Sequence, residues 1–76
     1  MGILKICPMC GKEHHINLSE EEAMKYEMYL YGIGNIQQML PDLGAVEREF
    51  LITGYCHSCQ AKIFGTANKP ELARWE

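Results

Sequence analysis

The sequence predicts a small α+β domain organised around a bound metal ion. Three features support this fold class: two C-x-x-C pairs, a strand-like pattern on both sides of the first pair, and a helix-capping signature after it. A chain of 76 residues allows one domain. At that length a hydrophobic core alone is marginal, so a metal, a disulfide or a partner chain is expected to add stability.

Composition excludes several classes of protein. With 47% apolar and 22% charged residues, the chain is not of the disordered type. No secretory signal is recognisable, and no apolar stretch approaches the ~20 residues of a membrane span. We therefore expect a cytoplasmic protein without a membrane partner. In that reducing compartment, paired cysteines indicate metal ligands sooner than disulfides.

The four cysteines are the candidate metal ligands. They form the pairs Cys7–Cys10 and Cys56–Cys59, with 45 residues between the pairs. Two residues between cysteines let the backbone turn so that both sulfurs face one ion, and nearby N–H groups can donate to them. Four thiolates leave no open position for water or substrate. The pattern thus predicts one structural zinc ion, whose binding energy is folding energy.

Other readings of the cysteines remain open. Tetrahedral sulfur also suits iron, as in rubredoxin-like sites, but the second turn lacks the proline and glycine of the first. Two disulfides, in three connectivities, are the purely structural alternative. For His14, His15 and His57 we expect solvated or partly packed side chains. Adjacent strand residues face opposite sides, so at most one of His14 and His15 can face the site.

The first cysteine turn is expected at the tip of a β-hairpin. Residues 3–6 are a short, mainly apolar run, and residues 13–18 alternate between two faces. Ser19 then begins a capping box with Glu22, which predicts a helix that continues to Tyr31 and ends at the glycines of residues 32–34.

Two further helical segments complete an amphipathic insert over residues 19–54. One runs from about Asn35 to Leu40 and stops at Pro41, and the next runs from residue 43 or 44 to about Thr53, with Gly54 as its C-cap. Apolar residues fit helical spacing on both sides of the proline. These are Ile36, Met39, Leu40, Leu43, Val46, Phe50 and Leu51.

The second cysteine pair opens the last expected element. Residues 56–64 predict a short C-terminal helix ended by Gly65, with Cys59 in its first turn, where N–H groups favour a thiolate. We therefore expect a single zinc-binding domain over residues 1–65. The tail, residues 66–76, is expected to be mostly extended and tethered by Leu72 or Trp75.

Three resemblances bear on these motifs. Through Cys7–Gly11 and Cys56–Cys59, the chain resembles treble-clef and zinc-ribbon domains, which implies a hairpin giving two ligands and a helix N-terminus giving two more. Residues 36–59 look like those of small zinc-binding proteins encoded by phages and their bacterial hosts, a likeness that implies no reaction. The arrangement of two pairs around a helical insert is also similar to small anti-sigma regulators of sporulating bacteria.

The insert favours a protein-interaction function. Several of its large apolar residues fall all round one helix and cannot all face one small core, so a protein partner or a homodimer is expected to cover the remainder. These residues are Tyr26, Met28, Tyr29, Leu30 and Tyr31. The expected role is a zinc-stabilised interaction module that acts as a small regulator in a phage or bacterial host.

Nucleic-acid binding by a zinc ribbon is the alternative, and charge argues against it. Residues 19–53 carry seven acidic and two basic side chains, a balance of −5, whereas phosphate binding needs a basic surface. The scattered basic residues that could form a patch near the metal are Lys5, Lys12, Lys62, Lys69 and Arg74. No catalytic triad, phosphate loop or open metal site is present, so neither an enzyme nor a small-molecule substrate is expected.

Overall fold

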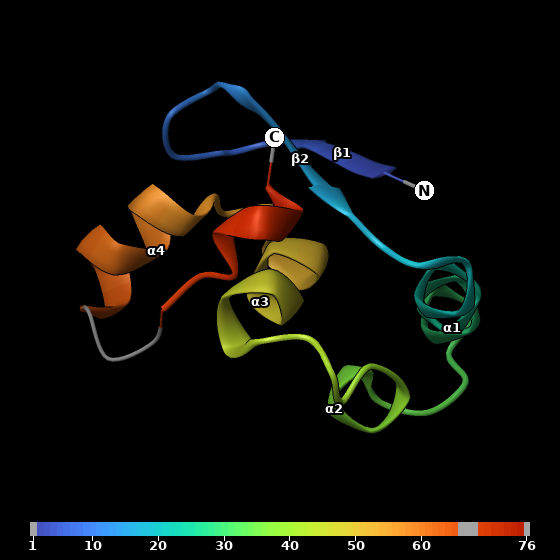
Figure 1. The fold of residues 1–76 in the computed structure, drawn as a ribbon. Coiled ribbons are helices and arrows are strands. Elements are labelled where there is room, and N and C mark those ends of the chain that lie inside the picture. Colours follow the sequence, from blue (N-terminus) through green and yellow to red (C-terminus); the bar gives the residue numbers. More distant parts are fainter. Residues whose placement is uncertain (1, 66–68, 76) are drawn as a thin grey trace.

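The computed structural model describes residues 2–65 and 69–75 and is a small compact α+β domain (Figure 1). A hairpin lies over a group of helices, and the C-terminal segment runs between the hairpin and α3 (Figure 1). The elements in chain order are β1 (Gly2–Ile6), β2 (Glu13–Asn17), α1 (Glu20–Leu30), α2 (Ile36–Met39), α3 (Ala45–Thr53), α4 (His57–Phe64) and the 3-10 helix η1 (Leu72–Arg74).

The predicted hairpin is confirmed. β1 and β2 pair antiparallel, with Gly2 opposite Asn17 and Ile6 opposite Glu13. The first cysteine pair occupies the connecting turn, where the Cys7 N–H donates to the carbonyl of Lys12 at 2.9 Å. Gly11 closes the turn with a φ of 71°, a conformation that glycine adopts without steric cost.

The capping box of α1 is also confirmed. The Ser19 hydroxyl accepts from the Glu22 N–H at 3.1 Å, and a Glu22 carboxylate oxygen accepts from the Ser19 N–H at 2.8 Å. α1 is capped at Tyr31, just before Gly32, whose φ is 82°. The glycines therefore end the helix where the sequence predicts.

The two helices on either side of Pro41 form as predicted. Asn35 caps α2 by accepting from the Gln38 N–H at 2.9 Å. Gly44 is the N-cap of α3, and Gly54 ends this helix in the left-handed conformation with a φ of 86°. Their buried apolar faces join residues from β2 and α1 in the main core. This core consists of Ile16, Leu18, Ala23, Tyr26, Ile36, Leu40, Leu43, Phe50 and Leu51.

The described part of the tail, residues 69–75, departs from the expected extended chain in one short helical turn. Residues 72–74 form η1, and Trp75 makes an antiparallel bridge with Ile16. Of the two expected tethers, Trp75 packs on the core, whereas Leu72 is largely exposed. Residues 66–68 and 76 of the predicted tail lie outside the described residues, and the division of the chain at residue 65 stays a prediction.

Candidate metal centre

The structure brings all four predicted ligands together. The sulfur atoms of Cys7, Cys10, Cys56 and Cys59 all lie within 4.8 Å of one another, and those of Cys10 and Cys56 are 4.0 Å apart. A tetrahedral site with metal–sulfur bonds of about 2.3 Å has sulfur–sulfur distances of about 3.8 Å. The cluster therefore has the dimensions needed to hold one metal ion and is compatible with zinc.

Two local structures present these sulfurs. Cys7 and Cys10 flank the hairpin turn, whereas Cys56 is the N-cap of α4 and Cys59 lies in its first turn. The Cys56 N–H donates to the Cys7 sulfur at 3.4 Å, so the backbone of one pair stabilises a thiolate of the other. This hydrogen bond between the two pairs requires the chain segments around residues 7 and 56 to lie side by side.

Burial differs among the four cysteines. Cys7, Cys56 and Cys59 are buried, whereas Cys10 is exposed. The first three form a second buried cluster, separate from the main core, against which Tyr55 and Trp75 pack. Solvent therefore reaches the centre from the side of Cys10, in the turn between β1 and β2.

The protein environment drives the pKa values of two thiols apart. Burial tends to raise the pKa of Cys7, but N–H groups of Cys56, Cys10 and Met9 donate to its sulfur and bring the pKa down to about 6. The pKa of Cys59 rises to about 12, because hydrogen bonding with Cys56 and burial both favour its thiol form. A metal that binds at Cys59 must therefore displace a proton from its sulfur.

The histidines lie as the sequence analysis expects, partly packed and outside the ligand set. Of the adjacent pair on β2, His14 faces the centre, with its Nε2 atom 3.6 Å from the Cys10 sulfur. His57 packs edge-on against Trp75, with ring centroids 4.9 Å apart.

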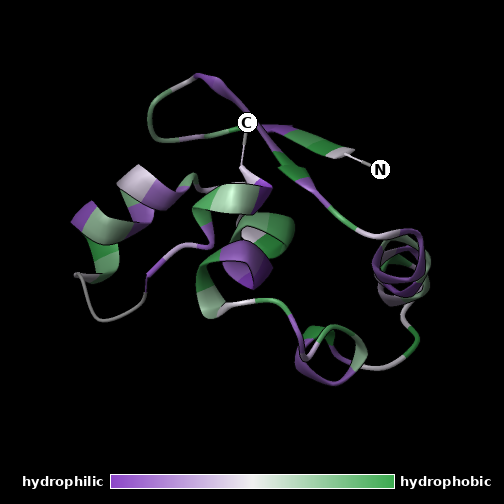
Figure 2. Ribbon diagram, viewed as in Figure 1, coloured by the Kyte–Doolittle hydropathy of each residue, from purple (hydrophilic) through white to green (hydrophobic). Residues whose placement is uncertain are grey.

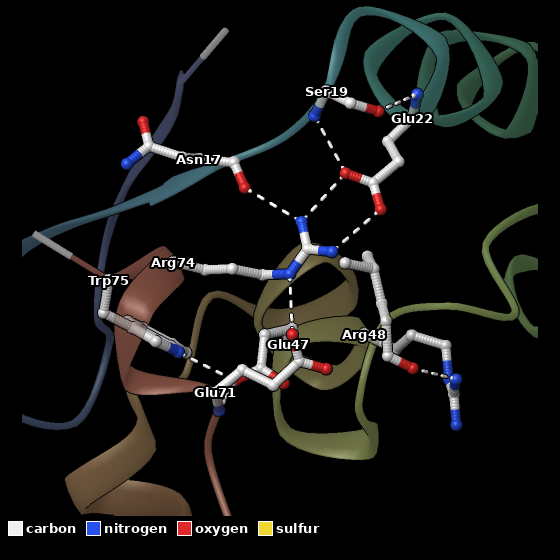
Figure 3. Close-up of polar contacts among 9 residues, drawn as sticks. Asn17, Ser19, Glu22, Glu47, Arg48, Glu71, Arg74 and Trp75 are labelled. Carbon is white, nitrogen blue, oxygen red and sulfur yellow. Dashed lines mark hydrogen bonds and ion pairs between the residues drawn. The ribbon is translucent and has the colours of Figure 1, made fainter.

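Sequence reasoning missed a buried carboxylate on α3. Glu47 is 0% exposed, and one of its oxygens, Oε2, accepts from the Trp75 indole N–H at 2.7 Å and from the Glu71 N–H at 3.0 Å (Figure 3). Its other oxygen has no hydrogen-bond partner in the described part of the chain. The spacing carried a signal, because Glu47 stands four residues after Leu43 and four before Leu51 on the apolar face of α3.

Arg74 was counted with the scattered basic residues, but its charge is already paired. Its guanidinium donates to both oxygens of Glu22, at 2.8 and 2.9 Å, and to the carbonyl of Asn17 at 3.1 Å (Figure 3). It also pairs with Glu71 at 2.8 Å. The ammonium of Lys5 likewise donates to the Leu51 carbonyl at 2.9 Å. Two of the five basic residues are thus engaged within the fold.

Comparison of the chain with protein-family models, with curated proteins and with solved structures gave no match. Within the described residues, no helix has the length and apolar character needed to cross a membrane.

Proposed function

We propose that this protein is a non-enzymatic, zinc-stabilised protein-interaction module. Its four-cysteine cluster supports a structural metal site, since four thiolates complete a tetrahedral shell and leave no position for a substrate. We assign a treble-clef arrangement, because a hairpin turn and a helix N-terminus each supply two sulfurs. We assign zinc rather than iron, because the second cysteine turn lacks the proline and glycine of the first.

The observation that carries the interaction function is an apolar surface on α1 and the turn that follows it. Four large apolar side chains there are between 51 and 76% exposed: Met24, Leu30, Tyr31 and Ile33. Tyr26, in contrast, faces the main core. Large exposed apolar side chains that come from one helix and its C-terminal turn are typical of a binding surface.

Carboxylates on the same face indicate the chemistry of the partner. Glu20, Met24 and Glu27 follow one another at helical spacing, and Tyr31 continues this stripe at the end of α1. Figure 2 shows α1 largely in hydrophilic colours. Within the described part of the chain, Glu20 and Glu27 have no ion-pair partner, and Lys25 is paired with Glu21 at 3.1 Å. We infer a partner segment that combines basic and apolar side chains.

The same carboxylates disfavour the two other candidate partners, a second copy of the chain and a nucleic acid. A second copy would place carboxylates against carboxylates, which like-charge repulsion opposes. Nucleic acid would meet a surface of its own sign, and Lys5 and Arg74 are held by the protein itself. The proposal extends to a role as a small regulator, by the resemblance of the two cysteine pairs around a helical insert to small anti-sigma regulators.

The test uses labelled helical peptides that share apolar positions and carry either lysines or glutamates. We expect the zinc-loaded protein to bind the basic peptide in fluorescence anisotropy, with an affinity that falls as salt rises. The variant Leu30→Ser with Tyr31→Ser should weaken binding at least tenfold, whereas Ile63→Ser, an exposed apolar position on α4, should not.

Equal binding of the basic and acidic peptides would overturn the assignment of the partner. So would a concentration-dependent dimer that the Leu30→Ser and Tyr31→Ser changes dissolve, or tighter salt-dependent binding of labelled RNA or DNA than of the basic peptide.

A further inference from the structure

Residues 69–75, which we call the strap, contact several parts of the molecule at once. Trp75 bridges to Ile16 of β2, and the Arg74 guanidinium pairs with Glu22 of α1. Glu47 of α3 accepts two hydrogen bonds from the strap, and His57 of α4 packs on the Trp75 ring. The strap is therefore held by groups that come from four different elements, and Figure 3 shows the contacts from β2, α1 and α3.

Trp75 stands between the two buried clusters. It packs against the main core and also against the cluster of Cys7, Cys56 and Cys59. Its ring meets Phe50 of the main core edge-on at a centroid distance of 4.8 Å. A single side chain thus connects the centre of the helical core to the metal ligands.

The same ring contacts two imidazoles that border the ligands. His57 lies between Cys56 and Cys59, and its ring centroid is 4.9 Å from that of Trp75. His14, whose Nε2 atom is 3.6 Å from the Cys10 sulfur, lies edge-on to Trp75 at 6.4 Å. The indole therefore borders both cysteine pairs, and the Glu47 carboxylate fixes its orientation at 2.7 Å.

We propose that the strap is an outer layer of the metal centre and that Trp75 is a positioning residue for metal binding. It orients the turn at Cys10 and the start of α4, so docking of the strap and binding of the metal favour each other. Linkage requires the two effects to be equal, because any factor by which the docked strap raises metal affinity is the factor by which metal stabilises docking.

The expected size follows from the behaviour of groups that support metal ligands. Loss of such a group lowers metal affinity by about 10-fold to 100-fold. We expect Trp75→Leu to lower zinc affinity by this factor, measured by competition with a chromophoric chelator. Two control variants set the baseline. Leu72→Ala changes an exposed strap residue, and Asn35→Ala removes the cap of α2, which destabilises the fold without touching the strap.

A second variant serves if Trp75→Leu does not fold. Arg74→Met removes the ion pair with Glu22 and leaves the indole in place. It should lower zinc affinity at least fivefold more than Asn35→Ala does. Trp75 is the chain's one tryptophan, so its emission reports on the strap directly. Zinc removal should shift this emission to longer wavelength, and the shift should need less chelator in Arg74→Met.

The proposal would be overturned if Trp75→Leu and Arg74→Met bound zinc no more weakly than Asn35→Ala does. It would also be overturned if the wavelength of the tryptophan emission stayed the same after zinc removal. The inference rests on metal binding, which is part of the proposed function. A wild-type protein that binds no zinc would refute both the proposed function and this inference. A wild type that binds zinc only as tightly as its strap variants would refute the role of the strap alone.

Discussion

At the scale of the residue, Glu47 shows how a buried acidic side chain is accommodated. Its carboxylate lies against the N-terminus of its own helix, where the dipole favours a negative group. A Cβ at Gly44, the N-cap, would stand 2.5 Å from Glu47 Oε1, so the glycine leaves the room that the carboxylate occupies. The buried acid and the missing side chain are thus two parts of one arrangement.

Glu47→Leu should destabilise the protein by about 2–4 kcal/mol, because the Trp75 and Glu71 N–H groups would lose their acceptor. Glu47→Gln should cost less than half of that, since an amide oxygen can accept both bonds. Urea denaturation of the zinc-loaded proteins measures the difference. Equal losses in the two variants would show that the acceptor is not what Glu47 contributes.

At the scale of the element, the start of α1 combines a local and a distant role. Glu22 completes the capping box with Ser19 and also receives Arg74 from the other end of the chain. The cap therefore fixes the position of the carboxylate that the strap requires.

Ser19→Ala should cost about 1 kcal/mol of unfolding free energy, because it removes the acceptor of the Glu22 N–H. Ser19→Asp keeps an acceptor and should lose less than half as much in the same urea denaturation. A loss as large in Ser19→Asp as in Ser19→Ala would contradict the capping role.

The Glu22 pair also predicts a dependence on pH. Bonds from Arg74 hold the pKa of Glu22 below its ordinary value of 4.5, against the opposing effect of burial. Because the folded pKa is the lower one, this contribution is fully present above the ordinary pKa and is lost as pH falls through the folded value. Glu22→Gln should flatten this part of the profile of unfolding free energy against pH. Arg74→Met should flatten it as well, and an unchanged slope in both would contradict the pairing.

At the scale of the whole molecule, short sequence patterns predicted most of the fold. The hairpin, the Ser19 cap, the glycine helix ends and the four ligands all follow from patterns a few residues long. The strap could not be predicted in this way, because Trp75 is held by Glu47 and Ile16, which lie far away in sequence. The apolar residues of the tail predicted a tether at Leu72 or Trp75, but no local pattern identified the groups that hold Trp75.

The two cysteine pairs enclose the helical insert in a loop that a metal ion would close. Ordering a loop of this length costs entropy, and the small main core offsets only part of it. A metal bound to four thiolates adds its binding energy to folding. The central claim is therefore that one ion at Cys7, Cys10, Cys56 and Cys59 holds the domain together.

Native mass spectrometry tests this claim most directly, because mass gives the metal content and the charge-state envelope reports on compactness. We predict one zinc ion per chain with a narrow envelope of low charge states, and after chelation a metal-free chain with a broad envelope of high charge states. A metal-free chain that keeps the narrow envelope, or a chain that takes up no zinc, would contradict the account.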